Sequence, residues 1–419
     1  MKNPCILGSL CAALVLAPHA LAQTDTPPPA TKEVVNLPTF TVESTKDNAY
    51  VGKEALSTTR IATDLMNLPQ TVTVFNRSFI DAVNPFNLSD LLNYAGGGQT
   101  GTLNWTSGRL IIRGFVSDGD YVDGFNPETA STVDMSLYDR VEIIKGPSAI
   151  FNASSPPGGL VNKITKSPTS YKVATLKVQV GTYDANRAEL DLGGPLTKDG
   201  KFMYRLITAY QDSKGYYDYT YMRRFVFAPM LKYQFGPDTQ LTVKYQYTDT
   251  DFPSYNGVPL DPRTLKPFDV PASRNLSEDD PYNWRTDHIS RGTFELTSRL
   301  SDFLAMRLAG IASFEEARRV ESVTTTWSDG SRSFINYTGG TVNRSTTAET
   351  TDSPRYALQN DYNFNFKTGP VGNNLLVGGE LSSAPGERWA YPGTSSPVDP
   401  FHITTPTVTV NYGTLSANT

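Results

Sequence analysis

Apolar and polar residues alternate with a period of two from Tyr171 to the end of the chain. Leu241, Val243 and Tyr245, for instance, each stand between two polar residues. This alternation predicts strands with one polar and one apolar face, about nine or ten in number. The pattern occurs both in a soluble β-sandwich and in a transmembrane barrel, where lipid-facing and lumen-facing residues alternate.

The lengths of the connections between these strands distinguish a transmembrane barrel from a soluble β-sandwich. Tight turns are expected at residues 193–200, 236–239, 300–303 and 368–373, and long connections at about 212–221, 251–284, 320–352 and 384–404. Short turns at one end of the strands and long loops at the other are typical of the periplasmic and extracellular ends of a barrel. We therefore expect antiparallel transmembrane strands here.

Residues 58–166 show shorter patterns that predict a compact α/β domain. Leu68–Phe75 alternates like a strand, and Asn87–Ala95 is predicted to be a helix that starts at a capping asparagine, Asn87, and is followed by glycines. Leu110–Phe115 and Arg140–Lys145 are predicted to be two further strands.

The first 22 residues have the features of an export signal. Lys2 supplies a positive charge, Ile6–Ala17 is apolar, and Ala20-Leu21-Ala22 places small residues where a signal peptidase reads them. The apolar stretch is too short to span a bilayer. We expect cleavage before Gln23.

Residues 23–57 are expected to form an extended tether, since they contain three consecutive prolines and cannot bury themselves. Within them, residues 34–42 form an isolated β-prone apolar stretch. Such a stretch either adds as an edge strand to the sheet of another protein or begins the next domain. Pro38 lacks a backbone donor, which suits an edge strand.

The composition argues against three classes of functional site: nucleic-acid-binding, thiolate and catalytic sites. The 419 residues carry a net charge of −5, which argues against a nucleic-acid-binding face. Both cysteines, Cys5 and Cys11, lie in the predicted signal, so the exported chain has no thiolate site. Only His288 and His402 remain after cleavage, without a recognisable nucleophile motif, so we expect no enzymatic activity.

Several motifs occur in a characteristic order. They are Leu68–Val74, Ile112–Phe115, Val122–Gly124, Asp139–Ser148, Pro157–Lys166 and Leu375–Leu381. In this order they resemble the plug and one barrel strand of a TonB-dependent outer-membrane receptor, closest to the siderophore-receptor branch. Phe151-Asn152 departs from the Tyr-Gly that is usual in the family.

The resemblance implies a mainly β fold, with a small α/β plug domain followed by an incomplete antiparallel transmembrane β-barrel. The barrel of the family has 22 strands, so we expect the chain to hold the N-terminal part of a receptor and to form an open, curved sheet. The expected divisions are a signal peptide at 1–22, a periplasmic tether at 23–57 with the TonB box at 34–42, the plug domain at 58–166 and the barrel part at 171–419.

The resemblance also implies a function. A receptor of this kind binds a ferric siderophore at the cell outer membrane and imports it with energy supplied through TonB. The implied partners are TonB, the siderophore and outer-membrane lipid, with no nucleic acid, and the complete receptor is expected to be a monomer. No resident cofactor or metal is expected, because the iron enters within the ligand. An importer of an oligosaccharide or a corrinoid is the alternative.

The resemblance assigns roles to individual residues. The expected TonB contacts are Val34, Val35, Leu37, Phe40 and Val42. Arg113 and Arg140 are expected to pair with barrel glutamates and keep the plug docked, although each also suits a solvated strand end. The expected ligand contacts, on the upper loops of the plug, are Trp105, Arg109, Tyr121 and Phe125. Aromatic rings and an arginine suit an anionic, partly apolar chelate.

Overall fold

The structure is a computed structural model, and the described residues are 40, 47, 50, 52–57, 60–85, 88–96, 98–103, 106–117, 120–127, 134–146, 157–253, 260–261, 266–267, 269–271, 283–324, 344–396 and 407–413. The predicted signal peptide at 1–22 and the first part of the tether, 23–39, lie outside this set. None of the helices in the described residues is long and apolar enough to cross a membrane.

Two small sheets and four short helical segments make up the described part of residues 58–166, which we call the plug. The first sheet has the order β3 (Thr71–Phe75), β8 (Tyr138–Lys145), β9 (Gly159–Thr165) and β7 (Asp120–Val122), and the second has the order β4 (Gly98–Leu103), β5 (Thr106–Ile112) and β6 (Phe115–Ser117). The helices are α1 (Arg77–Val83) and α2 (Leu88–Leu92), with 3₁₀ turns η2 (Leu65–Asn67) and η3 (Met135–Leu137). Strand β2 (Thr63–Asp64) pairs with β1 (Glu54–Ala55), which precedes the plug.

Strand β8 lies in the middle of the first sheet, and its apolar side chains Val141 and Ile143 are fully buried. They pack in one cluster with Ile80 of α1 and with Leu91 and Leu92 of α2. Complete burial of a large apolar side chain stabilises a fold by about 1.5–3 kcal/mol. This cluster is therefore the core of the plug.

Local chemistry explains where the first helix begins and ends. The side chain of Asn76 accepts a hydrogen bond from the Phe79 amide, and Asn84 adopts φ 52° at the other end. The sequence analysis did not predict this helix. It predicted a helix over Asn87–Ala95, where α2 covers the shorter Leu88–Leu92.

The prediction of one strand over Leu110–Phe115 is wrong. Arg113 and Gly114 have φ values of 52° and 83°, and Ile112 pairs with Phe115 across them. Two successive positive φ values are the geometry of a two-residue type I′ hairpin turn. Asp123 and Gly124 repeat this geometry with φ values of 50° and 84°. The glycines of these motifs therefore serve turns.

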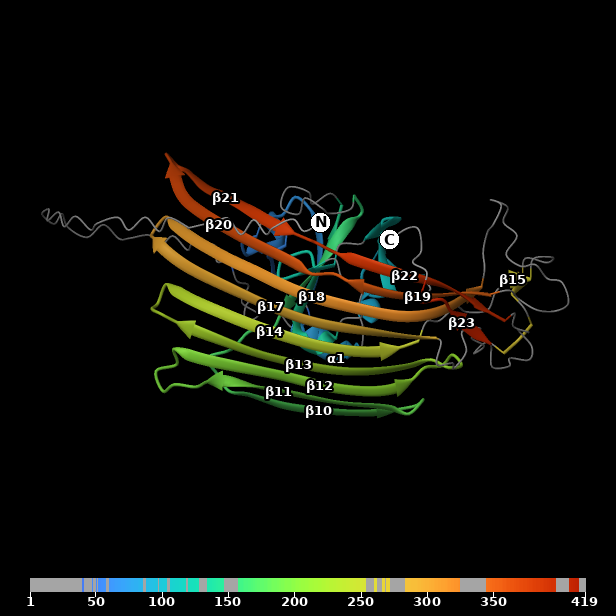
Figure 1. The fold of residues 1–419 in the computed structure, drawn as a ribbon. Coiled ribbons are helices and arrows are strands. Elements are labelled where there is room, and N and C mark those ends of the chain that lie inside the picture. Colours follow the sequence, from blue (N-terminus) through green and yellow to red (C-terminus); the bar gives the residue numbers. More distant parts are fainter. Residues whose placement is uncertain are drawn as a thin grey trace, which may run out of the picture. The chain divides into compact units, whose positions relative to one another are not determined.

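Most of the remaining chain forms one antiparallel twelve-stranded sheet, which we call the wall. Its strands are β10 (Val173–Gly181), β11 (Ala185–Pro195), β12 (Phe202–Lys214), β13 (Tyr221–Gln234), β14 (Thr239–Phe252), β17 (Trp284–Ser301), β18 (Leu304–Thr324), β19 (Arg344–Asp352), β20 (Arg355–Thr368), β21 (Val371–Ser383), β22 (Glu387–Ser395) and β23 (Val408–Val410). Figure 1 shows β10 to β18 side by side in sequence order. A separate hairpin pairs β15 (Leu260–Asp261) with β16 (Lys266–Pro267).

Two long strands of the wall are each interrupted once. β18 pairs with β20 through Leu304–Ser313 and with β19 through Glu316–Thr324, so β19 and β20 are two parts of one strand. They separate at Pro354, which has no backbone donor. β21 and β22 correspond in the same way, because they pair with β20 and β19 respectively. Counted as continuous strands, the wall has about ten, as predicted.

The predicted tight turns are confirmed, since each falls between consecutive wall strands. The prediction of a plain connection at 384–404 is wrong, because β22 lies within it. β22 is rich in Gly, Ser, Thr and Pro rather than in alternating apolar residues, so the pattern did not show it. Within the described residues β10 pairs with β11 alone, and the sheet does not close on itself.

The two faces of the wall have an inside-out distribution of polarity. Large apolar side chains exposed on one face include Leu176, Val178, Val180, Phe225, Phe227, Leu231, Val243, Tyr245, Leu375 and Val377. Charged or polar side chains buried on the other face include Arg187, Glu189, Asp191, Gln211, Arg224, Asp287, Arg291, Arg307 and Asp361. A water-soluble sandwich buries its apolar faces instead. A wall between lipid and a polar lumen requires the observed arrangement.

One cross-strand contact on the exposed face gives a test of this register. Gly310 of β18 lies opposite Phe294 of β17, and a Cβ on Gly310 would meet the edge of the Phe294 ring. Gly310→Ala should therefore lower the free energy of unfolding by about 1 kcal/mol or more, through overpacking. The measurement is denaturant unfolding of the purified chain in detergent.

The matched control is Gly292→Ala in the neighbouring strand, where a Cβ meets nothing within 4 Å. It should be neutral or slightly stabilising, since alanine loses less entropy than glycine on folding. Equal effects of the two substitutions would contradict the register.

Candidate functional site at the contact between plug and wall

A carboxylate of the plug lies between two arginines of the wall. Asp134 precedes the 3₁₀ turn η3 and accepts a hydrogen bond from the Ser136 amide at 2.9 Å. Both of its oxygens accept hydrogen bonds from Arg187 of β11 at 2.8 Å. Arg224 Nη1 of β13 is 3.6 Å from Asp134 Oδ2. All three side chains are buried, and Glu189 of β11 lies 3.4 Å from Arg187. Asp134 is thus a main source of compensation for the two arginines.

The surroundings favour the charged form of Asp134. Burial alone raises the pKa of a carboxyl group, but hydrogen bonds from Arg187 and Ser136 and the charges of Arg187 and Arg224 act in the other direction. The result is a pKa of Asp134 well below its usual range. The carboxylate is therefore ionised at neutral pH and holds both arginines.

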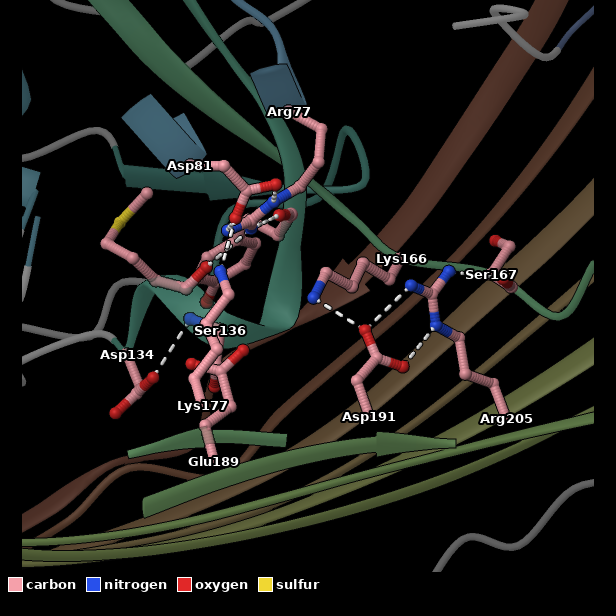
Figure 2. A network of polar contacts seen from close by, with 12 residues as sticks. Arg77, Asp81, Asp134, Ser136, Lys166, Ser167, Lys177, Glu189, Asp191 and Arg205 are labelled. Carbon is pink, nitrogen blue, oxygen red and sulfur yellow. Dashed lines mark hydrogen bonds and ion pairs between the residues drawn. The ribbon is translucent and has the colours of Figure 1, made fainter. Parts of the chain in front are cut away.

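A second contact reverses the polarity, with the cation on the plug side. Lys166, at the end of the plug, donates to Asp191 Oδ2 of β11 at 2.8 Å. Arg205 of β12 donates to both oxygens of Asp191 at 2.8 Å and to the Ser167 carbonyl at 3.0 Å. Figure 2 shows Asp191 between the two cations. Burial and the charge of Arg77 lower the pKa of Lys166, whereas Asp191 opposes both effects.

The turn at Asp123-Gly124 makes a third contact. Lys244 of β14 donates to Thr165 Oγ1 at 2.6 Å and lies 3.4 Å from Asp123 Oδ2. Gln359 of β20 donates to the Gly124 carbonyl at 3.2 Å. The neighbouring Phe125 packs against Ala309 and Ile311 of β18. The type I′ geometry thus presents this turn to the wall.

Further ion pairs lie at two other positions of the plug. Arg60 donates to Asp361 of β20 at 3.2 Å and to Glu380 of β21 at 3.3 Å. Asp81 of α1 forms an ion pair with Arg77 and also accepts from Lys177 of β10. Apolar contact accompanies them, since Ile207, Val226 and Met230 of the wall belong to the same cluster as the plug core.

The structure places the two arginines expected to dock the plug away from such pairs. Arg113 is exposed at the tip of the β5–β6 hairpin, and no ion pair involves it within the described residues. Arg140 is buried and donates to Asp47 at 3.0 Å and to the Glu54 carbonyl at 3.0 Å. Neither partner belongs to the wall. A docking role for Arg113 and Arg140 stays a prediction.

Of the residues expected to contact TonB, Phe40 alone is described. It is 6% exposed and packs with Ile61, with Ala305 of β18 and with Leu376 of β21. Val34, Val35, Leu37 and Val42 lie outside the described residues. In this structure the ring of Phe40 is therefore held against the wall.

Of the expected ligand contacts, Tyr121 and Phe125 have described side chains. Trp105 lies outside the described residues, and Arg109 lies in β5 in a position whose side chain is not described. Tyr121 is 4% exposed beside Ile144 and Leu160, and Phe125 is 1% exposed. This burial leaves neither ring surface for a ligand, so it does not support their predicted role, which stays untested.

The docking roles of Asp134, Lys166, Asp191 and Arg205 were not predicted from the sequence. For Asp191 and Arg205 of the wall, the sequence did offer one indication of a role inside the protein, because both lie on the polar face of a predicted strand. Asp134 and Arg187 are separated by 53 positions, so no local pattern could pair them. Among the described residues, no group of three or more His, Cys, Asp and Glu side chains is arranged to hold a metal ion.

Comparison with known proteins places this geometry in context. Residues 64–160 match the TonB-dependent Receptor Plug Domain. The ferripyoverdine receptor of Pseudomonas aeruginosa is 30% identical over 212 residues, which cover 48% of this chain and 26% of that receptor. The metal-pseudopaline receptor of the same organism is 32% identical over 276 residues, which cover 63% of this chain and 37% of that receptor.

A solved structure shows the same fold. The crystal structure of the ferripyoverdine receptor of the outer membrane of Pseudomonas aeruginosa, bound to ferripyoverdine, aligns with a TM-score of 0.75 at 20% identity. The alignment covers 91% of this chain and 51% of that one, so this chain spans about half its length. At this identity the likeness concerns the fold alone.

The cluster around Asp134 gives a test of docking. Asp134→Asn keeps the size of the side chain and its bond to the Ser136 amide, but removes the negative charge that faces Arg187 and Arg224, while Arg187 keeps its longer ion pair with Glu189. Removing one partner of a buried pair should cost about 3–5 kcal/mol. We expect a fall of this size in the free energy of unfolding, measured in detergent.

The control for this substitution is Asp184→Asn, which removes an exposed ion pair with Lys214. Exposed pairs contribute little, so its unfolding should match that of the unsubstituted chain. If the two substitutions had the same effect, the pair at Asp134 would not be important for docking.

The lowered pKa of Asp134 also predicts a pH dependence. The stabilisation of the fold by ionised Asp134 is fully present above the pKa of this group in the unfolded chain, about 4. It is lost as the pH falls from there towards the lower pKa of Asp134 in the folded chain. The unsubstituted chain should therefore lose more stability below about pH 4 than Asp134→Asn does. Unfolding midpoints measured from pH 6 downwards test this, and parallel curves would contradict it.

Proposed function

We propose that this chain, whose residues 64–160 match the TonB-dependent Receptor Plug Domain, is part of a receptor that binds a ferric siderophore at the outer face of the outer membrane and imports it with energy supplied through TonB. The observation that carries the proposal is the plug held against the polar face of the wall by ion pairs of both polarities. A plug docked in this way blocks passage along the wall until its contacts are rearranged.

The nature of these contacts suits repeated opening and closing. Ion pairs at Asp134 and Asp191 can be replaced by contacts with water when a lumen hydrates, whereas the apolar core of the plug gains nothing from separation. A partner must bind the two states differently to shift the plug between them. In the proposal that partner is TonB, which adds the segment at 34–42 to its own sheet through backbone hydrogen bonds.

The names of the relatives support the class of cargo. One relative is a receptor for ferripyoverdine and another for metal-pseudopaline, so both bind metal chelates. An oligosaccharide or corrinoid cargo is not favoured by these relatives. The iron would enter within the siderophore, and no cofactor of the protein is involved. The family comprises receptors and transporters, so we propose no enzymatic activity.

The remaining assignments belong to the same proposal. Residues 1–22 act as a cleaved signal peptide, 23–57 as the periplasmic tether, 58–166 as the plug domain and 171–419 as the barrel part. The exposed apolar face of the wall contacts outer-membrane lipid. The complete receptor acts as a monomer. Trp105 and Arg109 remain candidates for ligand contact.

Growth on defined iron sources tests this function. A strain that lacks the gene should fail to grow on at least one ferric siderophore as sole iron source, and the intact gene should restore growth. Unimpaired uptake of every ferric siderophore by the deletion strain would overturn the iron assignment. Loss of growth on an oligosaccharide instead would support the alternative cargo.

Two substitutions in the tether extend the same experiment to TonB. Val35→Pro removes a backbone donor from the segment at 34–42 and should abolish the restored growth, because strand addition depends on such donors. Asn36→Ala keeps the donor and should restore growth.

A further inference from the structure

The last residues of the tether are held against the plug by side chains of β8 as well as by the short pairing of β1 with β2. The structure describes Asp47, Tyr50 and residues 52–57 of this segment. Its short strand β1 pairs with β2, while the backbone partners of β8 are β3 and β9. Two side chains on one face of β8, Arg140 and Glu142, make polar contacts with the described part of the segment.

Glu142 accepts hydrogen bonds from two backbone amides and one hydroxyl of the segment. Its carboxylate accepts from the Leu56 amide at 3.1 Å, from the Ser57 amide at 2.9 Å and from Ser57 Oγ. Asn162 of β9, directly opposite Glu142, donates to Ser57 Oγ at 2.7 Å. Burial raises the pKa of Glu142, and the donated bonds oppose that effect.

Arg140 binds the segment ten positions earlier along the chain. It donates to Asp47 Oδ2 at 3.0 Å and to the Glu54 carbonyl at 3.0 Å. Its side chain is 1% exposed and that of Asp47 is 6% exposed. A buried ion pair of this kind is costly to break on one side only.

The segment also approaches the sheet closely at Gly52. A Cβ at this position would lie 2.5 Å from Val74 Cγ1 of β3, so only glycine fits. Shortly after Ser57, Arg60 binds Asp361 and Glu380 of the wall. The contacts of Arg140 and Glu142 therefore lie, along the chain, between two residues that contact the wall, Phe40 and Arg60.

We propose that Arg140 and Glu142 form a clasp that holds residues 47–57 against β8 and that opens as a unit before the plug sheet separates. They act as positioning residues for the tether. That TonB supplies the force which opens the clasp rests on the proposed function. The existence of the clasp does not depend on that function. A pull on the tether reaches the middle strand of the plug through these two side chains.

The sequence of release follows from the kinds of contact. Opening the clasp breaks a few side-chain hydrogen bonds, one ion pair and the two-residue pairing of β1 with β2, and it leaves the pairing of β3, β8 and β9 intact. Opening the sheet would also expose Val141 and Ile143, which are fully buried. The clasp therefore yields before the plug sheet does.

The test changes the tether side of the clasp, so that the plug sheet keeps its own residues. Ser57→Ala combined with Asp47→Asn removes the hydroxyl bonded to Glu142 and the charge bonded to Arg140. The matched control is Ser136→Ala combined with Asp64→Asn. Ser136 Oγ has no hydrogen-bond partner in the described residues, and an asparagine at position 64 can still cap η2.

Amide hydrogen exchange of the full chain is the first readout. The amides of residues 56 and 57 should exchange at least about tenfold faster in the clasp variant, because two of the contacts that keep the segment closed are gone. Amides of β8 and β9 should keep their rates, and the control should match the unsubstituted chain. Unchanged exchange at 56 and 57, or an equal acceleration in β8, would overturn the proposal.

Mechanical unfolding from an N-terminal handle is the second readout, and it requires neither cargo nor TonB. The unsubstituted chain should show a short early step of about 35 Å, the extended length of the ten residues freed between Asp47 and Ser57. The clasp variant should lose this step and keep the later ones. Retention of the step at the same force would overturn the clasp, while failure of siderophore uptake alone would overturn only the proposed function.

Discussion

The structure depends on the compensation of buried charge between plug and wall. The wall turns its polar face inwards, and Arg187, Asp191 and Arg224 on that face have little access to water. Each would be strongly destabilising without a partner. The wall supplies part of this compensation through Glu189 and Arg205, and the plug supplies the rest through Asp134 and Lys166, one anion and one cation. Because the two contacts have opposite polarity, a rotated or inverted plug would bring like charges together. The ion pairs therefore determine orientation as well as attachment.

Different kinds of contact hold different parts of the chain. Apolar packing around Val141 and Ile143 holds the plug together, and ion pairs attach it to the wall. Side-chain hydrogen bonds from β8 hold the end of the tether. These contacts differ in how they respond to water and to force. Hydration weakens an ion pair more readily than it weakens an apolar core, and a small cluster of hydrogen bonds opens locally. With this arrangement, separation of the plug from the wall would leave the fold of the plug intact.

The sequence predicted the parts of the fold that follow from local patterns, and missed those that depend on distant partners. Alternation at Leu241, Val243 and Tyr245 predicted strands and faces because its period of two is a property of the strand itself. Leu110–Phe115 was mistaken for one strand because a hairpin at Arg113-Gly114 continues the apolar pattern on both sides. Tyr121 and Phe125 suited a ligand by chemistry alone, yet burial depends on what packs around them. Asp134 has no distinguishing local motif, and its partners lie far along the chain.

A double-mutant cycle between Asp134 and Arg187 tests the central claim most directly. The cycle compares the unfolding free energies of Asp134→Asn, Arg187→Gln and the double variant with that of the unsubstituted chain. If compensation of buried charge holds the plug, the second substitution should cost much less once the first is present, with a coupling of at least about 1.5 kcal/mol. Additive effects would contradict the account, because the two charges would then act independently.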